Sequence, residues 1–408
     1  MCKEILSIND LVEAANRDDR FQLLNSPSVL AGNLDNAIHP LFHDSNLLEK
    51  SPYLRQALQL ASLFLAYDSV LEFFIPLTYG RYQTDTATRK TYLTNPVASK
   101  SAAEIKSYIA GVRKALYCLE HCVTFRWMPD TAKRLWARTV LCADRRPAHT
   151  SDCFQGFKYK SSVLIEINEK IRLFYEDEET GYRARSRCDQ FRHDFQTAVT
   201  MVHEVVHAHG IMRRGCMLEP DIRLDHPERT EWGYAWENYM FGSVINPQDR
   251  SRPGTHVLLR KTWSDDDQAR RCGGKEYSAV AVSWVAQWFR TETWARIEKQ
   301  GPLAVPPSTI RVKFLFSPKH HSWVVITDAP ETQSDIEQLH DEATMACAED
   351  KSHCQPSSMR NFTIGQVLWT LVDSKFLQKS NVPIPTRIPP KLNFSAVTGP
   401  STLQLLRR

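Results

Sequence analysis

The stretch HEVVHAHG, residues 203–210, constrains the fold of this chain more than any other part of the sequence. His203 and His207 are four residues apart, so on an α-helix their imidazoles lie one turn above each other and face one point. Apolar residues recur at helical spacing through the same segment: Phe191, Phe195, Ala198, Val199, Val202 and Val206. We therefore expect an amphipathic helix that begins at Asp189, as its N-cap, and ends at Gly210.

Two imidazoles at this spacing form half of a zinc site. With one further protein ligand they leave the fourth position of Zn²⁺ for water, as in catalytic rather than structural sites. Such a water loses its proton at about pH 7, and Glu204 could take that proton and return it to a leaving group. The pattern predicts Zn²⁺ as the cofactor, His203 and His207 as metal ligands, and Glu204 as the catalytic base. Two partly buried histidines without a metal are the plainer alternative, which the amphipathic context disfavours.

The stretch FQTAVTMVHEVVHAHG resembles the active-site helix of zinc metallopeptidases of the zincin superfamily and matches their H-E-x-x-H motif in full. The resemblance implies that the two histidines bind zinc and that the glutamate is the general base. Metzincins read H-E-x-x-H-x-x-G-x-x-H, and this chain follows that pattern to Gly210 but has Arg213, a cation, at the last position. His209 is about 120° around the helix from His203, so we expect it outside the site, as a capping or partly solvated residue.

A third ligand could come from a following helix, as the glutamate of gluzincins does. The segment EWGYAWENYMFG, residues 231–242, offers Glu231 and Glu237, and a straight helix can present only one of them to the metal. We favour Glu231, because the small residues Ala235 and Gly242 continue its face and permit close approach of the two helices. Glu237 is the alternative, and the glutamate that does not bind the metal would support the site or cap the helix. The segment also resembles uncharacterised fungal zincin-like proteins with the pattern E-x-G-x-x-W-E-x-x-x-F-G, and this likeness supports both glutamates.

The loop expected at residues 212–230 holds weaker candidates. His226 could also bind the metal, whereas Asp221, Asp225 and Glu228 are expected to be solvated charges. A peptidase further needs a donor for the oxyanion that forms on the carbonyl. The sequence does not rank the candidates: Tyr234, Tyr239, His256, Tyr277, His320 and His321.

The rest of the sequence predicts an α+β fold in three parts. Residues 1–122 would form a helical N-terminal subdomain, because apolar residues recur at helical spacing on both sides of a polar loop at 84–97. Residues 123–300 would form a zincin-like core of a small sheet, the active-site helix and the ligand helix. Residues 301–408 would form an extension with a proline-rich tail. The β-prone runs are at 123–127, 138–143, 161–167, 171–175, 311–316 and 322–326.

Composition and charge narrow the classes of function. A net charge of +4 without a long basic run argues against a nucleic-acid surface. The most apolar segments, 57–67 and 277–289, are too short to span a membrane, and acidic residues interrupt the N-terminus where a signal peptide needs an apolar run. We therefore expect a cytoplasmic protein. Its ten cysteines form no C-x-x-C pair, which favours reduced thiols over disulfides or a cysteine-rich zinc module; Cys118 and Cys122 would lie on the packed face of a helix.

The leading hypothesis is thus a zinc metallopeptidase-like hydrolase that cleaves a peptide or amide bond by zinc-activated water. Two alternatives remain open: a zincin-like protein that keeps zinc but acts as a binding module, and a zinc enzyme that acts on a small non-peptide substrate. The glutamate of the motif favours catalysis, because a structural zinc site has no use for a base.

Overall fold

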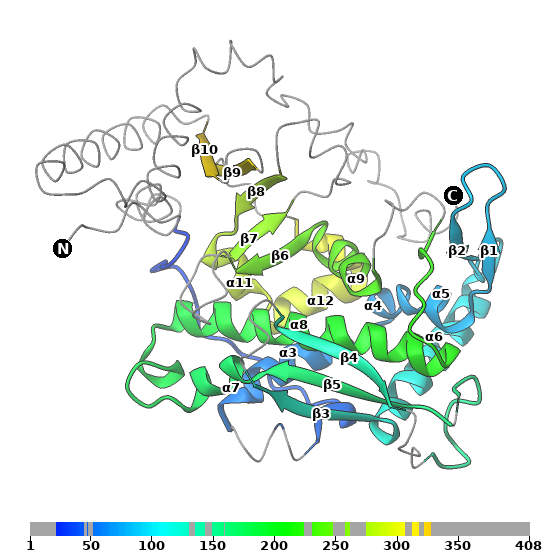
Figure 1. Cartoon of the computed structure of the whole chain (residues 1–408). Coiled ribbons are helices and arrows are strands. Elements are labelled where there is room, and N and C mark those ends of the chain that lie inside the picture. Colours follow the sequence, from blue (N-terminus) through cyan, green and yellow to red (C-terminus); the bar gives the residue numbers. More distant parts are fainter. Residues whose placement is uncertain are drawn as a thin grey trace, which may run out of the picture.

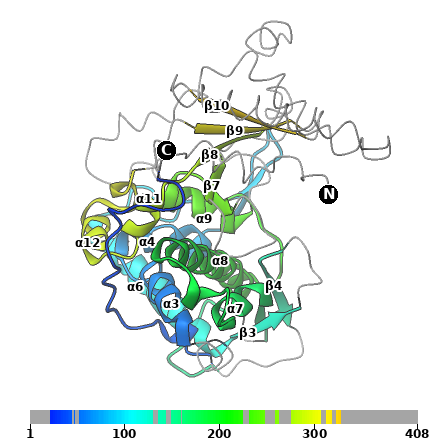
Figure 2. The same ribbon diagram turned by 90° about the vertical axis from the view of Figure 1, so that its left-hand side faces the viewer.

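The computed structural model describes residues 22–44, 47, 52–129, 135–142, 149–158, 160–223, 231–247, 258–261, 275–306, 312–317 and 322–327. The protein is a mixed α+β structure, as expected, and its central element is the long helix α8 (Arg187–Arg214). Figures 1 and 2 both show α8 in the middle of the described structure. On one side lies the sheet of β3 (Val123–Met128), β4 (Ala137–Cys142) and β5 (Ser162–Asn168), and on the other lie the strands β6 (Val244–Pro247), β7 (Leu258–Lys261) and β8 (Lys275–Ala279).

Helix α8 is longer than the sequence predicts at both ends. Its N-cap is Ser186, whose hydroxyl accepts a hydrogen bond from the backbone N–H of Asp189 at 3.1 Å, so Asp189 lies in the first turn and is not the cap. The helix also continues past Gly210 and ends at Gly215, which adopts the left-handed conformation with φ of 75°. The prediction that Gly210 ends the helix is therefore wrong.

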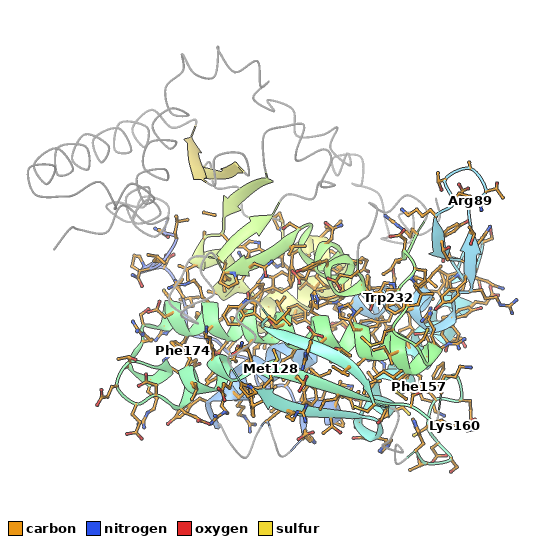
Figure 3. All side chains as sticks on the ribbon, in the orientation of Figure 1. Arg89, Met128, Phe157, Lys160, Phe174 and Trp232 are labelled. Atoms are coloured by element: carbon orange, nitrogen blue, oxygen red, sulfur yellow. The ribbon has the colours of Figure 1, made fainter. Side chains whose placement is uncertain are left out.

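Gly210 instead allows the side chain of Trp232 to pack closely against α8. A Cβ atom added at this position would lie 1.8 Å from the ring of Trp232, so only glycine allows that ring to lie against α8. Trp232 is the first residue of α9 (Trp232–Phe241) and is fully buried, and Figure 3 shows it next to α8. This contact fixes the start of α9 against the helix that carries the H-E-x-x-H motif.

A three-stranded sheet covers another side of α8. Its strands are β3 (Val123–Met128), β5 (Ser162–Asn168) and β4 (Ala137–Cys142), in that order, and each matches a predicted strand. Strand β3 runs parallel to β5, whereas β4 runs antiparallel to it. Strand β4 is thus an edge strand of this sheet, and it packs directly on α8.

The segment 171–175, predicted as a strand, is part of helix α7 (Glu169–Glu176). Asn168 caps this helix, since its side chain accepts a hydrogen bond from the backbone N–H of Lys170. The apolar residues are buried at helical spacing: Ile171, Phe174 and Tyr175. The alternation of a strand and the spacing of a helix are hard to distinguish over five residues, and here the cap decides between them.

Among the described residues before 122, helices span Arg55–Leu63, Asp68–Leu71, Phe74–Tyr79 and Ala102–Cys118, as the spacing of apolar residues predicts. Helices α3 (Arg55–Leu63) and α5 (Phe74–Tyr79) pack on α8, and their apolar side chains join one core with those of α8 and α9. A short hairpin lies within the polar loop predicted at 84–97 and just before it. The elements are η2 (Pro40–Phe42), η3 (Pro52–Leu54), α3 (Arg55–Leu63), α4 (Asp68–Leu71), α5 (Phe74–Tyr79), β1 (Tyr82–Thr84), β2 (Thr91–Leu93), α6 (Ala102–Cys118) and η4 (Leu119–His121).

The short helix η5 (Tyr182–Ala184) precedes α8, and the other remaining elements follow it. An antiparallel sheet has the strand order β10-β9-β8-β7-β6, and β9 and β10 match the strands predicted at 311–316 and 322–326. The elements are η5 (Tyr182–Ala184), β6 (Val244–Pro247), β7 (Leu258–Lys261), β8 (Lys275–Ala279), α11 (Val282–Gln287), α12 (Thr291–Gln300), η6 (Pro302–Ala304), β9 (Val312–Ser317) and β10 (Ser322–Thr327). Within the described ranges, no helix carries an apolar stretch long enough to cross a bilayer.

Candidate metal centre

Three predicted ligands lie together at the start of α9. The Nε2 atom of His203 lies 3.3 Å from Oε1 of Glu231, and Nε2 of His207 lies 2.7 Å from its Oε2. One donor atom from each of the three side chains can be chosen so that all lie within 4.8 Å of one another. Both imidazoles therefore direct the same ring nitrogen toward one carboxylate, as ligands of a single cation would.

The position of Glu231 follows from the way α9 begins. Glu231 is the N-cap residue, with extended backbone, and its side chain accepts hydrogen bonds from the N–H groups of Gly233 and Tyr234, both at 2.9 Å. A carboxylate at a helix N-terminus is stabilised by the helix dipole. Because Glu231 precedes the first helical turn, its direction is set by the cap, and the helical phase we used to favour it does not apply.

Gly233 leaves room for the imidazole of His203. A Cβ atom at this position would lie 2.4 Å from both Cδ2 and Nε2 of His203, which is far inside van der Waals contact. The imidazole therefore lies directly over the first turn of α9, and only glycine is small enough beneath it. This close approach lets the cap residue and the H-E-x-x-H helix meet at the same point.

The other nitrogen of each ring contacts a further carboxylate, a different one for each histidine. His203 Nδ1 lies 2.8 Å from Oε1 of Glu237, and His207 Nδ1 is hydrogen-bonded to Oε1 of Glu219. The second oxygens of these carboxylates accept backbone N–H groups, Glu237 from Ile245 at 3.2 Å and Glu219 from Trp232 at 3.0 Å. Metal-binding histidines commonly donate their other ring N–H to a carboxylate, which fixes the tautomer and the ring orientation.

The charges of the centre require a positive partner. Burial alone lowers the pKa of His207, but its hydrogen bonds to Glu219 and Glu231 outweigh burial and raise this pKa to about 10. Burial raises the pKa of Glu231, yet the charge of His203 and the hydrogen bond to His207 outweigh it and lower this pKa to about 2. The carboxylates thus favour protons on the imidazoles, because they raise the pKa of both rings above the ordinary value. A divalent cation would take the place of these protons, and the two imidazoles and one carboxylate suit Zn²⁺.

Glu204 lies on the side of α8 that packs against β4. Its Oε2 accepts a hydrogen bond from the hydroxyl of Thr139 at 2.6 Å, and the same hydroxyl lies 3.1 Å from the backbone oxygen of Glu204. Thr139 is in β4, so the edge strand holds this carboxylate in one orientation. Glu204 is 6% exposed, so its carboxylate is largely shielded from solvent.

His209 and Arg213 are excluded from the centre, as expected. The Nε2 atom of His209 lies 2.9 Å from the hydroxyl of Thr78, and the ring is fully buried between Phe74 and Phe157. His209 is thus a core residue and not a partly solvated one, and burial lowers its pKa to about 3. Arg213 donates from Nε to the backbone oxygen of Thr78 at 2.6 Å, so it secures the end of α8 against α5.

Two of the oxyanion candidates can be placed by their side chains. The ring of Tyr234 is edge-on to His203 with 5.0 Å between centroids, and this residue is 37% exposed. Tyr239 is directed elsewhere, because its hydroxyl donates to the backbone oxygen of Ser69 at 2.6 Å. Tyr277 belongs to β8, and its side chain lies outside the described atoms. The other histidine candidates and part of the expected loop lie outside the described residues: Asp225, His226, Glu228, His256, His320 and His321.

Sequence reasoning overlooked Glu219 and Thr139. Glu219 stands in a loop rich in charged residues, and no spacing relates it to His207. Its neighbour Asp221 forms a parallel bridge with Tyr92, and this bridge places the loop beside the hairpin of β1 and β2. For Thr139 the usable signal was its place in the predicted strand, one residue after the charged Arg138, so that the two side chains face opposite sides of the sheet.

No protein-family model matches this chain, and neither a curated protein nor a solved structure shows significant similarity to it. The chemistry of the centre is therefore inferred from its own residues, their contacts and their burial.

Proposed function

We propose that this protein is a zinc-dependent hydrolase of the metallopeptidase type, with a zincin-like core. His203, His207 and Glu231 would hold the Zn²⁺, and Glu204 would be the general base. The observation that carries the proposal is the pairing of both ring nitrogens of each histidine: Nε2 faces the shared carboxylate of Glu231, while Nδ1 is held by a separate carboxylate. A chance cluster of histidines has no reason to repeat this arrangement on both rings.

Solvent access supports a catalytic rather than a structural metal. The side chains of His203 and His207 are 15% and 17% exposed, and that of Glu231 is 30% exposed. Structural zinc sites are closed by four protein ligands, whereas catalytic sites keep three and an open position. Three partly exposed donors match the second pattern.

The bound Zn²⁺ would act as a Lewis acid toward water and toward a substrate carbonyl. Glu204 would take the proton of the attacking water at a carboxylate oxygen and deliver it to the leaving nitrogen. Thr139 would keep this carboxylate in place through its hydrogen bond. Tyr234, exposed beside His203, is the described side chain best placed to donate to the oxyanion.

The edge strand β4 supports a peptide as the substrate. Among the described strands β4 pairs only with β5, so its outer edge can accept an extended chain by strand addition. Thr139 lies in the middle of β4 and contacts Glu204, so a peptide on that edge would pass close to the base. A small amide substrate would make no use of this edge.

A zinc-binding module without catalysis is the second candidate. One observation favours it: Glu204 is 6% exposed and already accepts a hydrogen bond from Thr139, as a purely structural carboxylate would.

Zinc-loaded protein should therefore be tested on a broad peptide library, together with Glu204→Gln. We expect the variant to keep its Zn²⁺ and to lose hydrolysis by at least about 100-fold, because an amide cannot take a proton. Glu298→Gln, an exposed change on α12, is the matched control and should be unaffected. Wild-type protein that binds zinc but cleaves nothing would favour the binding module, and a fully active Glu204→Gln would refute the assigned base.

A further inference from the structure

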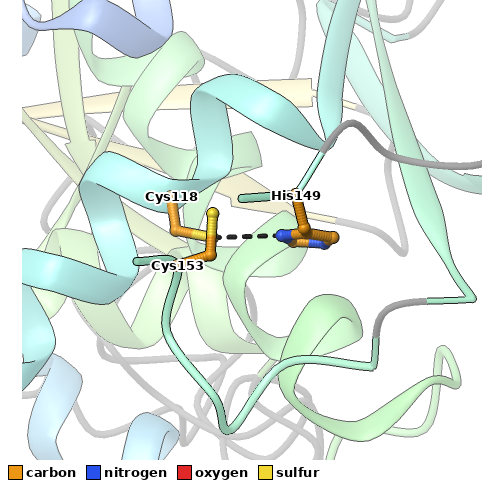
Figure 4. Close-up of side chains that lie close together, drawn as sticks. All are labelled: Cys118, His149 and Cys153. Carbon is orange, nitrogen blue, oxygen red and sulfur yellow. Dashed lines mark hydrogen bonds between the residues drawn. The ribbon is translucent and has the colours of Figure 1, made fainter. Parts of the chain in front are cut away.

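A second group of metal-binding side chains lies apart from this centre. Cys118, the last residue of α6, meets His149 and Cys153 from the loop between β4 and β5 (Figure 4). The Sγ atom of Cys118 lies 3.3 Å from Nδ1 of His149, although the two residues are 31 positions apart in sequence. One donor atom from each of the three residues lies within 4.8 Å of the others.

These distances suit a soft divalent cation. Zinc bonds of about 2.3 Å to sulfur and about 2.0–2.1 Å to nitrogen, at tetrahedral angles, separate the two donor atoms by about 3.6 Å. Only a small movement would therefore open the observed 3.3 Å contact between Cys118 and His149 around an ion. Two sulfurs and an imidazole are ligands that zinc prefers and that magnesium and calcium do not.

The surroundings of Cys153 suit a thiolate ligand. The backbone N–H of Thr150 lies 3.4 Å from its Sγ atom, and the hydroxyl of Thr150 lies 3.6 Å from it. Donors directed at a ligating sulfur orient it and stabilise its negative charge. Cys118 and Cys153 are 3% and 4% exposed, so the site is shielded as structural zinc sites are.

The loop that carries His149 and Cys153 supports the end of α8. The backbone N–H of Lys158 donates to the oxygen of Met212 at 2.7 Å, and Phe157 packs against His209. Figure 3 shows Phe157 close to this end of α8. A tie between this loop and α6 would therefore also hold the helix turn that follows His207.

We propose that Cys118, His149 and Cys153 form a second, structural zinc site that fastens the loop at 149–158 to the end of α6. On binding, each thiol releases one proton and the imidazole binds as the neutral ring, so that two protons leave for each Zn²⁺ taken up. The fourth ligand of such a closed structural site would come from a neighbouring side chain. The inference does not depend on the proposed hydrolase activity.

Cobalt substitution separates the two sites. Full-length protein, stripped of metal and reloaded with Co²⁺ under reducing conditions, should show a thiolate-to-cobalt charge-transfer band in the near ultraviolet, which His203, His207 and Glu231 cannot produce. Zinc content should fall from two ions per chain to one in Cys118→Ser and in Cys153→Ser, and the band should disappear. Cys188→Ser, at another buried thiol, is the matched control and should change neither quantity.

The variant His203→Ala should lose the other ion and keep the band, so failure of one site is distinguishable from failure of the other. The second site is refuted if wild-type protein shows no charge-transfer band, a measurement that needs no variant to fold. A band that persists in folded Cys118→Ser and Cys153→Ser would assign it to other thiols. A disulfide between Cys118 and Cys153, seen as a cross-linked peptide pair in digests of freshly purified protein made without reductant, would also overturn the proposal.

Discussion

Replacement of Gly233 by alanine should damage the metal centre while leaving the helices intact. The added Cβ would lie 2.4 Å from Cδ2 and Nε2 of His203, whereas ordinary van der Waals contact begins at 3.4 Å, so the ring must move by about 1 Å. Metal–ligand distances in a working site vary by only about 0.2 Å. The imidazole would therefore be displaced out of bonding range of an ion held by His207 and Glu231.

We expect Gly233→Ala to lower zinc affinity by at least about 100-fold, which is about 2.8 kcal/mol. The helix itself should not suffer, because Gly233 lies in the first turn of α9 without a left-handed φ and alanine favours helix by about 1 kcal/mol over glycine. Competition with a zinc chelator measures the affinity, and circular dichroism checks the fold.

Gly111→Ala is the matched control, because Gly111 also lies within a helix, α6, and its added Cβ would meet the hydroxyl of Tyr79 instead of the site. It should leave zinc affinity within threefold of wild type. Wild-type zinc affinity in Gly233→Ala would refute the close approach of α9 to His203, and with it the placement of Glu231.

Three further predictions concern the surroundings of the centre. Glu231→Ser keeps an N-capping oxygen but removes the proposed ligand, so it should lower zinc affinity more than Glu237→Ala does. For Glu237→Ala a loss of about 10 to 100-fold is expected. The reverse order in chelator competition would favour Glu237 as the ligand. Thr139→Val should lower kcat about 10 to 100-fold at unchanged zinc content, because Glu204, the proposed base, loses a hydrogen bond. Thr139→Ser should restore kcat, and equal rates in both variants would rule out the positioning role of Thr139. Burial lowers the pKa of His209 to about 3 in the folded protein. As the pH falls, the unfolded chain therefore protonates this histidine near its ordinary pKa of 6.5, whereas the folded protein protonates it only near pH 3. This contribution to stability is present above 6.5 and is lost as pH falls toward 3. Between pH 7 and 5 it amounts to about 2 kcal/mol of unfolding free energy, and denaturant titration at both pH values should show His209→Gln losing less by that amount.

Sequence periodicity alone determined much of the architecture. The helix that carries His203 and His207, three strands of the small sheet and the helical region before residue 122 all follow from the spacing of apolar residues. The spacing of apolar residues did not predict short segments or the ends of helices correctly. The run at 171–175 is a helix because Asn168 caps it, and α8 passes through Gly210 because the ring of Trp232 fills the space that a side chain would need.

The sequence by itself also singled out His203, Glu204 and His207, because their spacing within one helix fixes their relative positions. It could not place Glu231 by helical phase, since that residue precedes α9 and its direction comes from the cap. Glu219, Thr139 and the group around Cys118 depend on contacts between segments far apart in the chain, which only tertiary packing brings together. The sequence fixes the spacing of residues within one helix, whereas the distances between a helix, a loop and a strand depend on how these elements pack in the core.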